Sequence, residues 1–257
     1  MENYDAIPAV RRSSLWLMNK SPAHYQWAVN HPEEPTKAKQ FGIAAHKYIL
    51  QPGVFLNEYA VAPKVDRRTK EGKEAFAAFM DRLDGRSIVE AEDYETIKQM
   101  DEAIQGNEMA NELLNSFKCK YETIFVWTDD LTGEPCKCRT DCLTEYDGKK
   151  YIVDYKTADS CEDGHFEWAC RKYGYQFQAG MYREGVFQST SEEYGFVFVA
   201  QEKKPPYAVR VYFCTEEFIN QGYDKFRELI GLYHMCRESG TWPGYPEVDL
   251  VEEAANG

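Results

Sequence analysis

The chain has 257 residues, a formal net charge of −13 and a pI near 5.0, which is enough sequence to bury a sizeable core in one large domain or two small ones. This acidic balance argues against a protein that coats nucleic acid non-specifically, because such proteins carry a basic excess. Residues 1–5 lack a basic segment followed by an apolar run, and no run of about eighteen apolar residues occurs, so we expect a cytoplasmic protein without a membrane contact.

The N-terminal part of the chain predicts helices. Ser21 is a natural N-cap and Pro22 fits the first helical position, so a helix is expected to begin there. Residues 37–50 place apolar side chains mostly at i, i+3, i+4 and i+7, which predicts a helix that Pro52-Gly53 ends. His46 lies near the border of its apolar face, where a surface or core histidine is at least as common as a functional one.

The remaining elements follow from capping and alternation. Residues 54–64 are expected to connect or to form a strand, and 65–73 to form a mobile loop or a segment that faces nucleic acid. Further helices are predicted over 13–20, 71–83, 93–105, 107–117, 159–172, 173–187 and 216–237, and further strands over 121–128, 194–200 and 207–213.

This order of elements implies a mixed sheet with helices on its faces, hence an α/β or α+β fold. No linker-like or repeated segment divides the chain, so one domain over 1–257 is the simplest organisation. Within it we expect a helical part over about 1–117, a sheet with its helices over about 118–240, and a peripheral tail over 241–257.

A β-hairpin is predicted around the turn dipeptide Asp147-Gly148. A two-residue turn there would place Asp141 directly opposite Asp154 on one face, with Lys156 on the same face by the period-2 rule. Opposed carboxylates repel at a Cβ separation of roughly 5 Å, so the pair needs a proton or a cation. A divalent metal would satisfy it. The alternative is a merely solvated face of charged residues, and both interpretations predict the same hairpin orientation.

The eight cysteines raise the question of a disulfide or metal cluster. Without a secretory signal, reduced thiols are the better default in a chain of this size. Cys136-Lys137-Cys138 and Cys142 lie along one strand, which is poor geometry for a tetrahedral zinc site. We therefore expect buried free cysteines, and core positions for the aromatic side chains of Trp16, Trp27 and Trp168.

The ordered set of polar residues resembles the signature of the PD-(D/E)xK nuclease superfamily, in its RecB-like branch. Its members here are Gly42-x3-His46, Glu122, Asp141, Asp154-x-Lys156 and Gln178-x3-Tyr182. Within that branch the chain most resembles the nuclease domain of exodeoxyribonuclease VIII and its phage-borne relatives. The residues that carry this resemblance are Ser13 to Leu15, Ser21 to Tyr25, Trp127 to Glu134, Cys136 to Asp141 and Tyr175 to Tyr182. Thr140 stands where the motif has proline.

The resemblance implies a metal-dependent active site. Asp141, Asp154 and the main-chain carbonyl of Tyr155 would bind Mg²⁺, or Mn²⁺ as a substitute, since hard cations prefer oxygen ligands. Lys156 would orient or deprotonate water and stabilise charge on the phosphate. His46 would be a metal ligand or support one. The further catalytic residues implied are Glu122, Gln178 and Tyr182, the first assisting metal or nucleophile and the others holding the scissile strand.

Relatives in this branch degrade one strand of linear double-stranded DNA from its 5′ end. The resemblance therefore implies a 5′-to-3′ exodeoxyribonuclease that leaves 3′ single-stranded overhangs for recombination by annealing. The implied partners are linear duplex DNA, a single-strand annealing protein and further copies of the chain in a ring. An oligomeric ring would let an acidic subunit present its few basic residues inside a channel.

Two alternatives differ from this interpretation. A RecB-like nuclease of the CRISPR-adaptation or helicase-nuclease type carries an iron–sulfur cluster, with one cysteine before the motifs and three after them. Here only Cys214 and Cys236 follow Tyr182, and none precedes Cys119. The second alternative is a non-catalytic DNA-binding module on the same fold, against which the intact Asp141, Asp154 and Lys156 argue.

Overall fold

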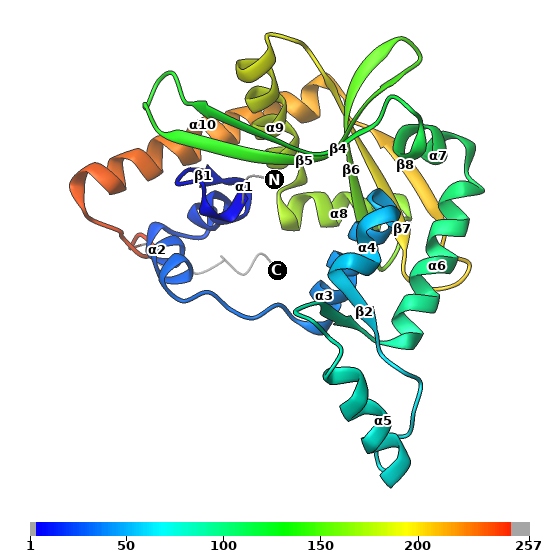
Figure 1. Cartoon of the computed structure of the whole chain (residues 1–257). Coiled ribbons are helices and arrows are strands. Elements are labelled where there is room, and N and C mark those ends of the chain that lie inside the picture. The colour runs from blue at the N-terminus through cyan, green and yellow to red at the C-terminus, as the bar shows by residue number, and fades with distance from the viewer. Residues whose placement is uncertain (1–3, 248–257) are drawn as a thin grey trace, which may run out of the picture.

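The computed structural model describes residues 4–247, and its helices and strands are shown in Figure 1. The helices are α1 Arg12–Leu15, α2 Pro22–Asn30, α3 Lys37–Leu50, α4 Pro52–Glu58, α5 Lys70–Met80, α6 Ala91–Gln105, α7 Glu108–Asn115, α8 Asp163–Tyr173, α9 Tyr175–Thr190 and α10 Glu216–Ser239, with short 3₁₀ helices at Tyr4–Ala6 and Trp16–Asn19. The strands are β1 Val10–Arg11, β2 Tyr59–Val61, β3 Ser87–Val89, β4 Lys120–Thr128, β5 Pro135–Tyr146, β6 Lys149–Ala158, β7 Gly195–Glu202 and β8 Val209–Phe213.

A six-stranded mixed sheet forms the centre of the protein. Its order is β1-β5-β6-β7-β8, and β4 pairs with the other edge of β5. β4, β5 and β6 form the predicted antiparallel meander, whereas β6 and β7 are parallel and are joined through α8 and α9. Parallel strands need such a crossover because the end of the first strand and the start of the second lie at opposite ends of the sheet. The predicted mixed sheet flanked by helices is confirmed.

Helices cover both faces of this sheet, so the protein has three layers. On one face α3, α6 and α7 pack against Cys142, Val153, Tyr155, Val197 and Val199. On the other face the N-terminal helices, α8, α9 and α10 pack around a second cluster that includes Ile152, Phe196 and Phe198 from the sheet and Phe177 and Phe226 from the helices. Strands buried on both faces read as continuous apolar runs, and residues 196–200 of β7 are such a run.

The pairing of β5 changes partner along its length. Its first residues pair with β1, with Val10 beside Cys136, and its last residues pair with β6, from Cys142 beside Val153 to the turn at Asp147-Gly148. Followed back from the turn, the ladder between β5 and β6 therefore ends at Cys142, next to Asp141. This break, at which β5 and β6 separate, is where the polar residues of the predicted site lie.

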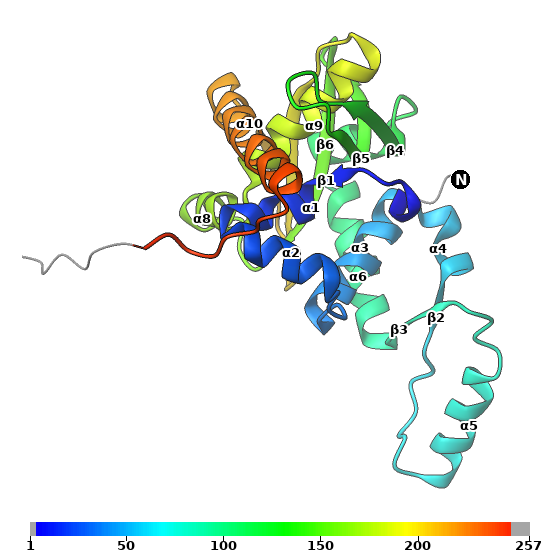
Figure 2. The same ribbon diagram turned by 90° about the vertical axis from the view of Figure 1, so that its left-hand side faces the viewer.

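Helix α3 has the predicted bounds, and Thr36 caps it by accepting a hydrogen bond from the Lys39 amide. The expectation of a strand or connection at 54–64 was wrong for its first residues, because Pro52 begins the new helix α4 at a position where its missing amide hydrogen costs nothing. The sequence also missed β3, which pairs with β2 in a separate two-stranded parallel sheet. Beyond these strands α5 projects from the rest of the protein (Figure 2).

The segment after α10 is partly described. Trp242 stacks on Tyr25 with ring centroids 5.4 Å apart, and the Ala23 amide donates to the Pro243 carbonyl, so residues 241–247 run along α2. The rest of the predicted tail, residues 248–257, lies outside the described residues. Between residues 4 and 247, no helix is long and apolar enough to span a membrane.

Candidate metal-dependent active site

The hairpin brings its two aspartates to the break between β5 and β6. The predicted register is confirmed from Tyr146 beside Lys149 up to Cys142 beside Val153, and Asp141 and Asp154 occupy the next position. There the side chain of Asp141 replaces the backbone ladder, because its Oδ2 accepts a hydrogen bond from the Tyr155 amide at 2.9 Å. The separation of the strands thus makes room for a carboxylate without leaving this amide unsatisfied.

Three of the predicted side chains form a compact cluster. One ligand atom from each of His46, Glu122 and Asp141 lies within 4.8 Å of the others. His46 Nε2 lies 2.8 Å from Asp141 Oδ2, and His46 Nδ1 lies 3.7 Å from Glu122 Oε1. Helix α3 supplies the imidazole from the layer above the sheet. Glu122 has a φ of +51°, an uncommon conformation for a residue with a side chain, at the position of β4 that faces Asp141 across the ladder.

The electrostatics of this cluster combine burial with opposed charges. Burial acts to lower the pKa of His46, but the carboxylates of Asp141 and Glu122 outweigh it and raise that pKa. Burial also raises the pKa of Glu122, although Arg139 Nε at 2.9 Å acts in the opposite direction. The pKa of Asp141 is lowered, because His46, Lys156 and the Tyr155 amide together exceed the effect of its burial.

Asp154 is the most deeply buried acid of the site, with 2% of its surface exposed. Its Oδ2 forms an ion pair with Lys156, and its Oδ1 accepts a hydrogen bond from the side-chain amide of Gln178. Gln178 closes the set by accepting a hydrogen bond from Lys156 Nζ at 3.2 Å. Helix α9 therefore holds both catalytic candidates of β6 in fixed orientations through one amide.

The face that carries Asp154 is covered by helix α9, so the interpretation as a solvated face is wrong. Burial and the nearby Asp141 raise the pKa of Asp154 despite its ion pair with Lys156. The pKa of Lys156 is also raised, since Asp154 and Asp141 outweigh its burial. Lys156 therefore stays protonated. Its single ammonium does not fully offset the effects of burial and of Asp141 on the Asp154 carboxylate. An additional cation would relieve this imbalance.

The residues present fit a divalent metal ion. Asp154 Oδ2 is buried and ion-paired with Lys156, and within residues 4–247 it accepts no further hydrogen bond, so it keeps lone pairs that a metal ion could use. The cluster of His46, Glu122 and Asp141 supplies further ligand atoms nearby. Carboxylate oxygens are the ligands of hard divalent cations, and one imidazole is compatible with them.

Tyr182 lies one helical turn after Gln178, where its ring packs against the buried cluster of α9 and α10. Burial, together with charges that include those of Cys138, Asp154 and Asp141, raises its pKa well above the usual value. Tyr155 is buried and donates its hydroxyl hydrogen to Gln201 at 2.7 Å. Its hydroxyl thus points away from the acids, while its ring centroid lies 6.3 Å from that of His46 and its main-chain amide binds Asp141.

Arg12 also reaches this region, although the sequence indicated for it only a possible place in a basic path toward nucleic acid and no part in the active site. Its Nη2 donates to the carbonyls of Tyr173 and Gly174, at the end of α8, and its buried Nε has no partner among residues 4–247. Its charge is close enough to influence the electrostatics of Tyr182 and Asp154. The only signal in the sequence was the basic pair Arg11-Arg12, which resembles ordinary surface charge.

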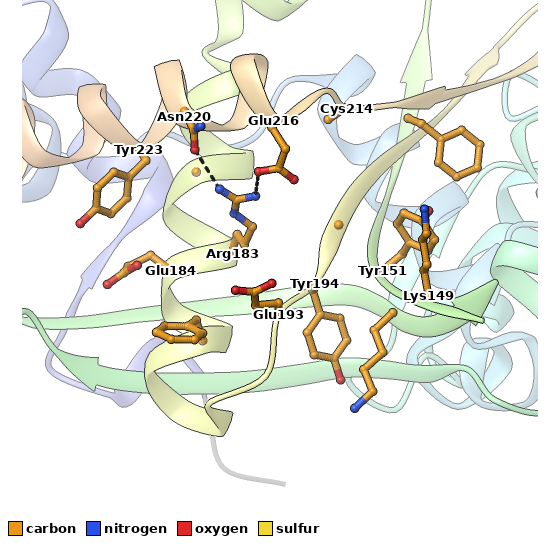
Figure 3. A pocket seen from close by; sticks show the side chains of 15 residues that line it. Lys149, Tyr151, Arg183, Glu184, Glu193, Tyr194, Cys214, Glu216, Asn220 and Tyr223 are labelled. Carbon is orange, nitrogen blue, oxygen red and sulfur yellow. Dashed lines mark hydrogen bonds and ion pairs between the residues drawn. The ribbon is translucent and has the colours of Figure 1, made fainter. Parts of the chain in front are cut away.

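A separate cavity of about 640 Å³ lies near the first residues of β6 and β7 (Figure 3). It is lined by Lys149, Tyr151 and Tyr194 on one side and by Arg183 of α9 on another. Lys149 precedes Asp154 by five strand residues, roughly 17 Å. Arg183 is already paired, at 2.5 Å to Glu216 and 2.9 Å to Asn220. This cavity is therefore distinct from the carboxylate cluster.

The cysteines and tryptophans give mixed outcomes. All eight cysteines lie in described residues and are free thiols, and none belongs to the cluster of three possible metal ligands found there. Trp16 packs on Phe177, with ring centroids 5.3 Å apart. The core positions expected for Trp27 and Trp168 are wrong, since 65% and 51% of their surfaces are exposed.

Comparisons with known proteins agree with this geometry. Residues 12–253 match the family model described as a PDDEXK-like domain of unknown function, DUF3799. The structure is similar to that of a protein described as a putative exonuclease from Eubacterium rectale, with a TM-score of 0.60 and 11% identity over 93% of this chain and 87% of that chain. At this identity the likeness shows the fold alone.

Other comparisons add little. The structure of the protein SSO0001 matches with a TM-score of only 0.31 and 16% identity, over 73% of this chain and 84% of that one, which is too weak to support an inference. A search of curated proteins returned no match. The family match spans nearly the whole chain and the described fold agrees with it, so this chain belongs to the PDDEXK-like domain family DUF3799.

Proposed function

We propose that the protein is a metal-dependent exodeoxyribonuclease that hydrolyses phosphodiester bonds of linear double-stranded DNA. The observation that carries this proposal is the assembly of Asp141, Asp154 and Lys156 with His46 and Glu122 at the break between β5 and β6. The PDDEXK-like family and the likeness to a protein described as an exonuclease support it.

The metal would be held by Asp141 and Asp154, with His46 and the Tyr155 carbonyl as further ligands, and Mg²⁺ is the ion we propose. A bound divalent ion lowers the pKa of a coordinated water and neutralises charge on the phosphate. Glu122 lies beside His46 and is positioned to accept a proton or to hold a water. Divalent ions of this type keep several waters, which agrees with a site that has few protein ligands.

Lys156 is the group that would stabilise the phosphate. Its ammonium is fixed by Asp154 and by Gln178 Oε1 at 3.2 Å, so it is preorganised before any substrate arrives. Its raised pKa keeps it charged at neutral pH, which suits electrostatic stabilisation of developing charge better than service as a general base. We therefore assign Lys156 a charge-stabilising and water-orienting role.

Polarity and assembly follow from the resemblance to exodeoxyribonuclease VIII and are part of the proposal. We propose that degradation runs 5′ to 3′ and leaves a 3′ single strand on which an annealing protein loads. We also propose a homo-oligomeric ring around the DNA. Its motive is electrostatic, because a chain with a net charge of −13 needs its basic segments gathered in a channel to approach DNA.

The test is incubation of the purified chain with linear duplex DNA labelled at either the 5′ or the 3′ end. In Mg²⁺ we expect early loss of the 5′ label, no degradation in EDTA, and no degradation of a closed circular duplex. Degradation in EDTA or nicking of the circle would contradict a metal-dependent exonuclease, and early loss of the 3′ label would reverse the polarity.

A matched pair of variants tests the site itself. Asp154→Asn keeps the shape of the buried side chain and removes its charge, so we expect loss of cleavage with retained DNA binding. The control is Asp159→Asn. Asp159 is exposed, directly follows β6 and pairs with Lys203 at 2.7 Å, so this variant should cleave like the wild type. Wild-type turnover by Asp154→Asn would show that the hairpin is not the active site, and a chain that only binds DNA would be a non-catalytic module.

A further inference from the structure

Helix α8 and the start of α9 carry aromatic side chains outward from the proposed active site. The ring of Tyr175 lies 5.0 Å from Lys156 Nζ, Tyr173 lies 6.0 Å from Tyr175, and Trp168 lies 6.4 Å from Tyr173. We call Trp168, Tyr173 and Tyr175 the aromatic strip. It begins at the lysine assigned to the phosphate and ends at the protein surface.

The outer part of the strip is exposed to a degree that packing does not explain. Trp168 and Tyr173 expose 51% and 46% of their surfaces, whereas Tyr175 is half-buried against Phe198 and Phe166. Large exposed aromatic side chains next to each other mark an interaction surface more often than isolated ones do. The strip therefore presents rings to a partner that approaches over the end of α8.

Positive charge accompanies these rings. Lys172 Nζ lies 4.3 Å from the ring centre of Trp168 and 5.2 Å from that of Tyr173. Arg171 precedes it at the exposed end of α8, and Arg12 binds the carbonyls of Tyr173 and Gly174 beneath the strip. Cations next to exposed aromatic rings are the combination that binds single-stranded nucleic acid, because bases stack on rings while the backbone is attracted to the cations.

The backbone holds the strip in a fixed relation to the site. Gly174 ends α8 in the left-handed conformation, with a φ of +65°, and α9 starts with the next residue. A side chain at this position would collide with the Trp16 ring, since an added Cβ would lie 2.6 Å from it. Tyr173 and Tyr175 therefore flank a tight turn whose second helix carries Gln178 into the catalytic cluster.

We propose that the aromatic strip binds unpaired nucleotides of the cleaved DNA strand, next to the scissile phosphate. This inference rests on the proposed nuclease function, because the strip gains its meaning from its continuity with Lys156. Bases inside a duplex are stacked on one another and cannot stack on side chains, so the strip selects a strand that has left the duplex. The duplex end must accordingly fray before its strand reaches the catalytic cluster.

The test measures DNA binding without cleavage, by fluorescence anisotropy in Mg²⁺ with probes whose phosphorothioate linkages resist hydrolysis. The probes are a labelled single-stranded oligo(dT) and a labelled blunt-ended hairpin duplex. For Trp168→Ala we expect the Kd for oligo(dT) to rise about 5- to 150-fold, which is the range that loss of one base–aromatic stack produces. The Kd for the blunt hairpin should change less than twofold, and Trp168→Phe should restore tight binding because it keeps a ring.

Trp27→Ala is the matched control, because Trp27 is a tryptophan that is also more than half exposed and that stacks on His31 at the end of its own helix α2. It should bind oligo(dT) like the wild type. Quenching of tryptophan fluorescence by oligo(dT) should likewise be lost in Trp168→Ala and kept in Trp27→Ala. Unchanged affinity and unchanged quenching in Trp168→Ala would overturn the inference.

The outcomes separate this inference from the proposed function. If the wild type degrades linear duplex DNA while Trp168→Ala binds oligo(dT) normally, the nuclease stands and the strip has no role in DNA binding. If Trp168→Ala instead changes the elution volume of the DNA-free protein and leaves oligo(dT) affinity unchanged, the strip is a protein contact and the inference is overturned. Absence of cleavage by the wild type would refute the proposed nuclease function. The anisotropy assay does not measure cleavage, so its result is independent of that outcome.

Discussion

Replacement of Gln178 by alanine tests whether helix α9 organises the catalytic pair. In the wild type the Gln178 amide donates to Asp154 Oδ1 and accepts from Lys156 Nζ, inside a region where Asp154 is almost completely buried. Removal of the amide leaves a buried carboxylate oxygen without a donor. A hydrogen bond to a charged group contributes about 1.5–3 kcal/mol, so the free energy of unfolding should fall by about that amount.

Two assays measure the consequence. Thermal unfolding in EDTA, followed by circular dichroism, should show a Tm lower by roughly 3–12 °C, given about 2–4 °C per kcal/mol for a chain of this size. The cleavage rate at saturating Mg²⁺ should fall by about 100-fold or more, because displacement of catalytic groups by about 1 Å has effects of that size. The Kd for duplex DNA should change little, since Gln178 is buried and its side-chain amide is already bound to Asp154 and Lys156.

Gln188→Ala provides the control on the same helix. Gln188 is exposed and, among residues 4–247, its side chain donates to Glu184 alone, at 2.8 Å, so its loss should change neither the Tm nor the cleavage rate measurably. Gln178→Glu adds a second check, because it keeps an acceptor for Lys156 but places another carboxylate beside Asp154. A Gln178→Ala protein with wild-type turnover and wild-type Tm would refute the idea that this amide fixes the site.

Three further predictions concern stability and metal binding. Arg227→Met leaves the buried Asp129 without its guanidinium and should lower the free energy of unfolding by about 3 kcal/mol at pH 7, measured in urea. Burial raises the pKa of Asp129, but its hydrogen bonds from Arg227 and from a neighbouring threonine outweigh this and lower it, so the stabilisation is present above about pH 4 and is lost as the pH falls through the lower folded value. The difference between wild type and variant should therefore shrink in acid, and a constant difference would contradict the assignment. Mg²⁺ at about 100 times its Kd should stabilise the wild type by about 2.7 kcal/mol, and Asp141→Asn should lose most of that gain unless the ion binds elsewhere. Gly222→Ala should destabilise by about 1–3 kcal/mol because its Cβ would lie 1.6 Å from the Gln176 carbonyl oxygen, whereas Gly231→Ala on the same helix meets no atom within 4 Å and should not destabilise.

Local signals in the sequence predicted much of the fold. The N-caps Ser21 and Thr215 and the turn Asp147-Gly148 each act through atoms within a few residues, so α2, α10 and the hairpin follow from short stretches of chain. The two-residue strand β1 has no such signal. Val10 pairs with Cys136 across more than a hundred residues, and nothing near Val10 distinguishes it from a loop.

The sequence predicted which residues lie together at the candidate site, but it did not predict what covers them. Alternation along the hairpin showed that Asp141, Asp154 and Lys156 share a face, but it could not tell whether that face meets water or helix α9. What covers a strand is decided by tertiary packing, here by Gln178 more than twenty residues later. The same limit applies to Trp168, because the sequence of a short helix does not show whether an aromatic side chain points toward the core or toward solvent.

The charges of the site bear on how so acidic a protein would bind the DNA that we propose as its substrate. Glu122, Asp141 and Asp154 bring three negative charges, and each has its own cationic or imidazole partner, in Arg139, His46 and Lys156. Even with His46 protonated, as its raised pKa favours, three positive charges only balance three negative ones, so the cluster alone offers a phosphate no net attraction. One divalent ion makes the cluster cationic. DNA binding at the site should accordingly depend on metal even in the absence of cleavage, and Asp154→Asn, which removes one negative charge, should bind DNA less dependently on Mg²⁺ than the wild type. Anisotropy with the blunt hairpin, with and without Mg²⁺, measures this difference, and equal metal dependence of the two proteins would show that the phosphate is bound by charges outside the cluster.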